Sequence, residues 1–282
     1  RLAMKYGAIT AMVGQGIGPI SDSELRTHAK SVLPHINFIS LRENRTGGPL
    51  LRSLGVAPDR MLTTGDDAIE LAHKLRSEQL GNGLGVNLRV ANYSEINQNL
   101  IEQLRLVVQG AAKMRKAPMV SIPISRVPGE EDALNIRQLT AGYHTVLDQG
   151  EQLDAPPKVI KQIQLCRLVI IGSYHAAVFA LAQGIPAVCL AKSDYYIDKF
   201  LGLAHQFGAG CKVILLQDDH FQESLTAAIE SLWESAELVR PKLLEAAEQQ
   251  IELSHKAYER IYELVRNHKS SVPRLKPRAL TG

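Results

Sequence analysis

The residues best suited to chemistry come directly after an apolar run, residues 168–171, which predicts a buried strand. Gly172, Ser173, Tyr174 and His175 follow this run and lead into a helical pattern rich in small residues. The N–H groups at the start of a helix attract anions, and a histidine can donate or accept a proton near neutral pH. We therefore expect His175 to be a general acid or base, and the three residues before it to bind an anionic substrate. A histidine satisfied by a neighbouring carbonyl is the alternative interpretation.

Basic side chains also follow other apolar runs of the sequence. Arg89 ends the run at residues 84–89, and Arg42 and Lys192 each come directly after a further run. A guanidinium fork matches the oxygens of phosphate or carboxylate, and an ammonium group adds a positive charge. These three side chains are therefore candidate substrate-binding groups. Local salt bridges are the alternative for the two arginines.

A glycine-rich turn, residues 14–19, ends the first apolar run of the chain. It superficially resembles a dinucleotide-binding fingerprint, but its spacing is Gly-x-Gly-x-Gly and Pro19 delays the next helix. We therefore expect a tight turn that presents Gly16 to the substrate, and we expect no cofactor. Ser21 is expected to cap the helix that follows this turn, and Asp66 or Asp67 to cap a later one.

Apolar runs alternate with helical patterns along the chain, which is typical of an α/β fold with parallel sheets. The expected strands lie at residues 8–13, 38–41, 60–64, 84–88, 118–122, 144–147, 168–171, 187–190 and 212–215. The expected helices lie at 21–33, 49–54, 67–77, 94–115, from about 129, 157–166, 174–183, 194–207 and 221–267. Because ligands of such sheets bind at the carboxyl ends of the strands, the candidate residues above should meet in one cleft.

The Gly-Asn-Gly sequence at residues 81–83 is the expected hinge between two lobes. We predict an N-terminal α/β lobe at residues 1–80, a C-terminal α/β lobe at 81–220, and a long helix with a tail at 221–282 that packs back on the first lobe. The chain begins at Arg1 and soon enters a strand. We therefore expect it to be part of a longer protein whose first lobe is incomplete here.

The composition fits a globular enzyme, with 45% hydrophobic and 22% charged residues among 282. A net charge of +3 is too small to indicate a nucleic-acid partner, and no apolar run approaches the ~20 residues of a membrane helix. Cys166, Cys189 and Cys211 lack metal-ligand spacing and lie in apolar runs, so we expect no metal and a cytoplasmic location.

In these motifs the sequence resembles the polysaccharide pyruvyl transferase family. The family pattern is matched in order by the turn at 14–19, by Arg42, Glu43 and Thr46, and by the segments 55–56, 64–68, 86–89 and 168–186. The resemblance implies a GT-B fold of two facing lobes, with phosphoenolpyruvate as donor and a sugar of a cell-surface polysaccharide or its precursor, free or lipid-linked, as acceptor. It also implies that His175 is the essential histidine and that Arg89 binds the donor.

One position departs from the family pattern. The family commonly has an arginine two residues before the histidine, where this chain has Ser173. Either Arg42, Arg126 or Lys192 supplies that charge, or the substrates differ. A nucleotide-sugar glycosyltransferase or epimerase of the same fold, and a non-catalytic relative, are the alternative functions. The acceptor sugar cannot be identified from the sequence.

Overall fold

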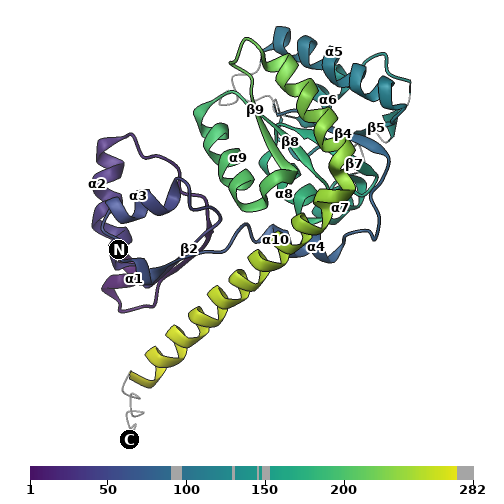
Figure 1. The fold of residues 1–282 in the computed structure, drawn as a ribbon. Coiled ribbons are helices and arrows are strands. Elements are labelled where there is room, and N and C mark those ends of the chain that lie inside the picture. The colour runs from purple at the N-terminus through teal and green to yellow at the C-terminus, as the bar shows by residue number, and fades with distance from the viewer. Residues whose placement is uncertain (90–96, 129–130, 145, 148–152, 272–282) are drawn as a thin grey trace, which may run out of the picture.

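The chain forms two parallel β-sheets, each with helices packed on it (Figure 1). The structure is a computed structural model that describes residues 1–89, 97–128, 131–144, 146–147 and 153–271. The first sheet has the order β1-β2-β3, with β1 at Ala11–Gln15, β2 at Phe38–Leu41 and β3 at Met61–Thr63. The second has the order β6-β5-β4-β7-β8-β9. Its strands are β4 (Gly83–Asn87), β5 (Met119–Ser121), β6 (Val146–Leu147), β7 (Cys166–Ile171), β8 (Ala187–Ala191) and β9 (Cys211–Leu215).

The helices alternate with these strands, as an α/β fold requires. They are α1 (Leu2–Lys5), α2 (Ser23–Val32), α3 (Gly47–Ser53), α4 (Ala68–Lys74), α5 (Gln98–Arg115), α6 (Asp132–Thr140), α7 (Pro156–Ile163), α8 (Tyr174–Ala182), α9 (Asp194–Phe207) and α10 (Phe221–Ser271). All described strand pairs are parallel, and the two sheets are separate. The predicted α/β class with two lobes and a long final helix is confirmed.

Strand β7 shows how the second sheet is buried on both faces. Val169 and Ile171 join the apolar cluster that contains α8, whereas Leu168 and Ile170 join the cluster that contains α5 and the start of α10. Strands buried on both faces are apolar without alternation, which is why residues 168–171 form an unbroken apolar run. The packing fixes the carboxyl end of β7, and with it the first turn of α8, in one place.

Helix α4 packs on the second lobe although it precedes the expected hinge. Ile69 and Ala72 belong to the same apolar cluster as α8, and His73 Nδ1 lies 3.1 Å from the Ala182 carbonyl oxygen. The packing therefore changes from the first lobe to the second at residues 64–67. The expected boundary at residue 80 falls one helix later than this change.

Helix α10 is the second connection between the lobes (Figure 1). Its first part packs on the second sheet, and its later part reaches the first lobe, where the Arg260 guanidinium lies 5.0 Å from the centre of the Phe38 ring. Arg260 also donates a hydrogen bond to the carbonyl of Asp59. The predicted contact of this helix with the first lobe is present. Residues 272–282 of the expected tail lie outside the described residues.

Several helix starts differ from the sequence prediction. Asp22, rather than Ser21, caps α2, since its side chain accepts a hydrogen bond from the Leu25 N–H at 2.6 Å. Helix α1 was not predicted. The expected starts at residue 94 and near residue 129 lie outside the described residues.

Candidate functional site

A carboxylate joins an arginine of the first lobe to the candidate histidine of the second. His175 lies in the first turn of α8, and its Nε2 is 3.9 Å from Asp66 Oδ2. The same oxygen is 3.8 Å from Arg42 Nη1. The other oxygen of Asp66 accepts a hydrogen bond from the Ala68 N–H at 3.0 Å, which fixes the carboxylate at the start of α4. Asp66 therefore stands where the chain crosses between lobes.

Arg42 is held by contacts from both lobes. Its guanidinium lies 4.4 Å from the centre of the Tyr174 ring, and its carbonyl accepts a hydrogen bond from Gln206 Nε2 at 2.8 Å. Gly16 leaves room for it, because a Cβ at position 16 would lie 2.3 Å from Arg42 Nε. Within the described part of the chain this buried Nε has no hydrogen-bond partner. The arrangement holds the Arg42 guanidinium at the boundary between the two lobes.

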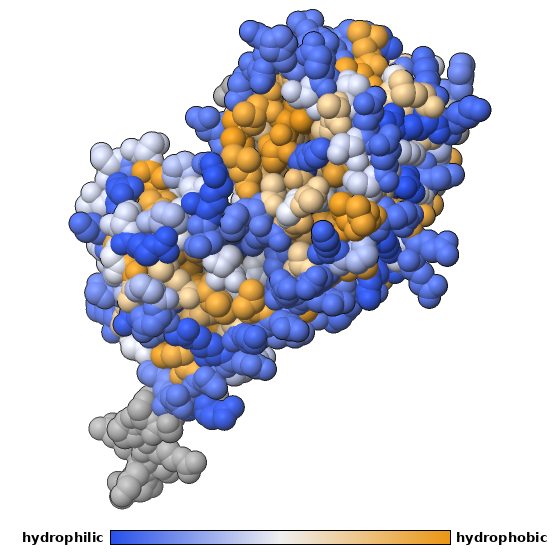
Figure 2. Space-filling model, in the orientation of Figure 1, coloured by the Kyte–Doolittle hydropathy of each residue, from blue (hydrophilic) through white to orange (hydrophobic). Residues whose placement is uncertain are grey.

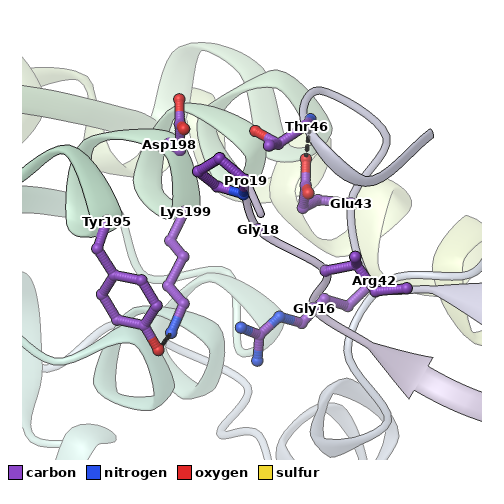
Figure 3. A pocket seen from close by; sticks show the side chains of 10 residues that line it. Gly16, Gly18, Pro19, Arg42, Glu43, Thr46, Tyr195, Asp198 and Lys199 are labelled. Atoms are coloured by element: carbon purple, nitrogen blue, oxygen red, sulfur yellow. Dashed lines mark hydrogen bonds between the residues drawn. The ribbon is translucent and has the colours of Figure 1, made fainter. Parts of the chain in front are cut away.

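A hollow between the lobes places a lysine opposite Arg42. This interlobe hollow is lined by Gly16, Ile17, Gly18, Pro19, Arg42, Glu43, Thr46, Tyr195, Asp198 and Lys199. Figure 3 shows the Arg42 guanidinium and the Lys199 ammonium pointing into it from different lobes. Lys199 contacts the Tyr195 hydroxyl, and burial lowers its pKa. The Glu43 carboxylate is engaged within its own lobe. It accepts hydrogen bonds from the N–H groups of Thr46 and Gly47 at 3.0 and 3.1 Å.

Arg89 is oriented by a buried carboxylate. Its Nε lies 3.5 Å from Asp132 Oδ1, and Asp132 is 0% exposed. Oδ2 of Asp132 accepts hydrogen bonds from Asn87 Nδ2 and from the N–H groups of Ile124 and Ser125, each at 2.9 Å. Burial raises the pKa of Asp132, and the Arg89 guanidinium acts in the opposite direction. Asp132 thus joins the ends of β4 and β5 beneath the candidate site.

The proton affinity of His175 reflects these neighbours. Burial of the ring lowers its pKa, Asp66 raises it, and the positive charges of Arg42, Lys199 and Arg89 lower it again, for a net decrease. Arg42, Lys199 and Arg89 therefore all disfavour a proton on this one histidine. A bound anion would offset their charge and raise the pKa of His175.

A second hollow lies on another side of His175. It has a volume of about 400 Å³. It is lined by Ala68, Leu71, Ile124, Arg126, Leu153, Asp154, Ala155, Pro156, Val159, His175 and Phe179. Because most of these side chains are apolar, we call it the apolar hollow. His175 lines the apolar hollow and also lies beside the Asp66–Arg42 pair.

The other predicted residues have distinct places in this arrangement. The Gly172 N–H donates to the Asn87 carbonyl at 3.0 Å, and a Cβ there would lie 3.0 Å from the Arg89 nitrogen, so Gly172 permits close approach of β4 and β7. Ser173 and Tyr174 are buried, at 3% and 5% exposure, and Tyr174 serves as the surface beneath Arg42. Lys192 follows β8 and lines neither hollow described above.

Sequence reasoning missed three residues of this arrangement. Asp66 was expected only as a helix cap, although it lies within the 64–68 segment of the family pattern. Lys199 could have been found from its i, i+4 spacing to Tyr195 on an expected helix. Nothing in the sequence pattern marked Asp132, because Asn87 and Arg89, which it contacts, lie far before it in the sequence.

Comparison with known proteins places the chain in a family. The profile of the polysaccharide pyruvyl transferases matches residues 1–194. The chain belongs to the polysaccharide pyruvyl transferase family. Membership in this family supports an enzymatic, group-transferring role. No curated protein sequence matches the chain significantly.

Solved structures that resemble this family member show its fold. A protein assigned as a UDP-N-acetylglucosamine 2-epimerase from Listeria monocytogenes has a TM-score of 0.63 and 13% identity, covering 97% of this chain and 72% of its own. A glycosyltransferase from Rickettsia africae has a TM-score of 0.58 and 12% identity, covering 96% and 74%. The N-terminal domain of Candida albicans trehalose-6-phosphate phosphatase has a TM-score of 0.57 and 14% identity, covering 95% and 68%. The fold is the GT-B fold that the resemblance implied.

Three further observations bear on the site and the surface. Among the described residues, no group of three or more His, Cys, Asp or Glu side chains could hold a metal ion. No helix in the described part of the chain has the length and apolar character needed to cross a membrane. The face drawn in Figure 2 is mainly hydrophilic, with smaller apolar patches on both lobes.

Proposed function

We propose that the chain transfers the three-carbon group of phosphoenolpyruvate to two hydroxyls of a sugar, forming a pyruvate ketal and inorganic phosphate. The methylene carbon of the donor takes up a proton, and the first hydroxyl adds to the central carbon. The bond from that carbon to the phosphate oxygen then breaks, and the second hydroxyl closes the ketal ring. Of the two hydroxyl protons released, one balances the proton on the methylene and the other leaves with phosphate.

The observation that carries this proposal is a half-exposed histidine beside the Asp66–Arg42 pair, with Lys199 lining the same hollow as Arg42. The side chain of His175 is 49% exposed, while that of Asp66 beside it is 10% exposed. Phosphoenolpyruvate carries a phosphate and a carboxylate on three carbons, so it needs several positive charges and one proton donor close together. Arg42, Lys199 and Arg89 are the charges that act on His175.

Arg42 takes the place of the arginine that the family commonly has at the position of Ser173. Ser173 is buried and Arg42 lies over the neighbouring Tyr174 ring, so the charge comes from the first lobe and reaches the same region. Arg126 lines the apolar hollow, and Lys192 lines neither hollow. Of the three candidates for this charge, Arg42 therefore has the best position.

His175 is the proton donor to the methylene carbon. In the empty site its pKa is lowered, so the ring is mainly neutral near pH 7. The anionic donor raises this pKa when it binds. The histidine then takes up the proton that it later donates. Asp66 keeps the ring oriented and stabilises the protonated form.

The test is a donor screen with the purified chain and a panel of sugars, in which phosphate release and the mass of the sugar are measured together. Phosphoenolpyruvate is compared with nucleotide sugars as donor. We expect phosphate release and a sugar heavier by one pyruvate ketal. A gain of a sugar unit from a nucleotide sugar would reject pyruvyl transfer.

Two histidine variants connect this activity to the site. His175→Gln should lower turnover by about 10²–10⁴-fold, which is the usual contribution of a positioned acid or base. His205→Gln is the matched control, because His205 is exposed on α9. Equal turnover by both variants would remove His175 from the mechanism.

A further inference from the structure

One side of α9 lies against the first lobe. Tyr195, Asp198, Lys199, Gly202 and Gln206 have the spacing i, i+3, i+4, i+7 and i+11, so they share one side of this helix. The first three line the interlobe hollow (Figure 3). The last two lie against the segment that follows β2. The helix that borders the proposed donor site therefore also contacts the first lobe directly.

The backbone of Arg42 is hydrogen-bonded to both lobes. Its N–H donates to the Gln15 carbonyl at 3.1 Å, which continues the pairing of β1 with β2. Its carbonyl accepts from Gln206 Nε2 at 2.8 Å, and the two residues are 164 positions apart in the sequence. The side chain that starts from this backbone reaches the Tyr174 ring and Asp66. Because the two backbone partners belong to different lobes, they place the Arg42 charge relative to both.

The amide of Gln206 is used on one side only. Its Nε2 donates to the Arg42 carbonyl, whereas its Oε1 is buried and has no hydrogen-bond partner among the described residues. A buried amide oxygen without a partner destabilises a fold, and an apolar side chain of the same length would avoid this loss. Stability alone therefore does not favour glutamine at this position, and the bond to Arg42 is the contact that requires its N–H.

Gly202 allows α9 to approach the same segment closely. A Cβ at position 202 would lie 3.0 Å from Glu43 Oε2 and 3.1 Å from Glu43 Cβ. The Glu43 carboxylate is itself held by the N–H groups of Thr46 and Gly47. Glycine is less favourable than alanine inside a helix, so the position needs a reason for its glycine. The close approach of Glu43 supplies that reason.

We propose that Gln206 and Gly202 are positioning residues for Arg42. Gln206 holds the Arg42 backbone to the second lobe, and Gly202 sets the distance between α9 and the segment at residues 42–46. Neither residue lines the interlobe hollow, so both act on a bound anion through Arg42. The identity of that anion rests on the proposed function. The placement of Arg42 does not, and it can be measured without any donor.

The first test is Gln206→Met, which removes the hydrogen bond and keeps the length of the side chain. The KM for phosphoenolpyruvate should rise by about three- to tenfold, the effect of one neutral hydrogen bond. The kcat should stay within about twofold of the wild type, because the groups that react are unchanged. Gln222→Met, at an exposed position of α10, is the matched control and should keep the wild-type KM.

The second test displaces the segment after β2 in two steps. Gly202→Ala and Gly202→Leu place side chains of increasing size against Glu43. Alanine and leucine are better helix formers than glycine, so α9 should remain formed, which circular dichroism checks. The KM for phosphoenolpyruvate should rise in both variants, and more with leucine. The same two substitutions at Gly110, a glycine of α5 whose Cβ would meet nothing within 4 Å, are the control.

The third test needs no donor. The positive charge of Arg42 lowers the pKa of His175, so this pKa should rise when Arg42 moves away. Asp66 raises the same pKa, and its release from Arg42 acts in the same direction. Lys199 and Arg89, which also lower it, are not touched by Gln206→Met. NMR titration of the His175 ring in the ligand-free variant measures the change.

The outcomes separate this inference from the proposed function. A raised KM with nearly unchanged kcat, together with a raised pKa of His175, supports it. An unchanged KM and an unchanged titration in the folded variants overturn it, and so does a fall in kcat and melting temperature at constant KM. If the wild type does not use phosphoenolpyruvate, the proposed function fails and the titration alone decides. A raised pKa of His175 in Gln206→Met then keeps the positioning role, and an unchanged pKa rejects it.

Discussion

At the residue scale, the site depends on one negative charge among several positive ones. Arg42, Lys199 and Arg89 all disfavour a proton on His175, and Asp66 favours it. Without Asp66, only the negative charge of the bound donor would favour protonation of the ring. The carboxylate is thus the group that sets the pH range over which the histidine can act as an acid.

The variant Asp66→Asn tests this role. A general acid must be protonated, so turnover falls as pH rises through the pKa of His175 in the complex. Asp66 raises that pKa, and the amide removes the charge while keeping the oxygen that accepts from the Ala68 N–H. The falling limb of the kcat–pH profile should therefore move to lower pH, with the larger loss of activity above pH 7.

The control for this variant is Asp219→Asn, an exposed position in the loop after β9. Its profile should match the wild type. A profile of Asp66→Asn that is lower at every pH but unshifted would assign Asp66 a purely structural role.

At the element scale, the turn after β1 and the ends of the second sheet determine where the cations lie. Gly16 has no side chain, which leaves space for Arg42, and Asp132 holds Arg89 at the end of β4. These supports come from elements that are distant in sequence. Their contribution can be measured separately from that of the charged groups.

Gly16→Ala should weaken donor binding without unfolding the protein. The new Cβ would lie 2.3 Å from Arg42 Nε, and the flexible guanidinium can move away at little cost. That movement carries the positive charge of Arg42 away from Asp66 and out of the interlobe hollow. The KM for the donor should therefore rise by about tenfold, as for the loss of one charged contact. Gly110→Ala is the control, because a Cβ there meets nothing within 4 Å and Gly110 lines neither hollow. Identical KM values for the two variants would contradict this role of Gly16.

Asp132→Ala should lower the free energy of unfolding by about 3 kcal/mol, since it removes a buried carboxylate that pairs with an arginine and accepts hydrogen bonds from an amide and two backbone N–H groups. The groups concerned are Arg89, Asn87 and the N–H groups of Ile124 and Ser125. Urea denaturation followed by circular dichroism measures the change. A loss below about 1 kcal/mol would mean that the loop after β5 re-forms its bonds elsewhere.

The elements themselves were largely predictable, whereas their partners were not. Strands such as β2 and β7 are buried, so an unbroken apolar run in the sequence predicts them. The positions of Arg42, Arg89 and His175 directly after strands could then be read from the sequence. The lobe to which α4 belongs depends on Ile69 and Ala72 packing against α8, and no local pattern encodes that contact. For the same reason Asp132 was found only from the structure.

At the scale of the whole molecule, two connections hold the lobes together. One is the crossing at residues 64–67, and the other is α10, whose Arg260 reaches Phe38 and the Asp59 carbonyl. The crossing carries Asp66 of the candidate site, whereas Arg260 contacts other residues of the first lobe. The geometry of the site therefore depends also on contacts that its own residues do not make.

Arg260→Ala should loosen the first lobe with a small loss of stability, about 1 kcal/mol for a partly exposed cation–ring contact. We expect faster amide hydrogen exchange in β2 and in residues 58–63, with the exchange of β7 and β8 unchanged. Arg266→Ala, an exposed position further along α10, is the control. Unchanged exchange in the first lobe would show that α10 does not support it.

The location of Asp66 at the crossing has a consequence for how the molecule can be observed. Asp66 is the group that raises the proton affinity of His175, and it is carried by the segment that links the lobes. Any change in the angle between the lobes that alters the 3.9 Å separation must alter the titration of the imidazole. The NMR chemical shift of the His175 ring against pH thus reports where the linking segment lies relative to the first turn of α8.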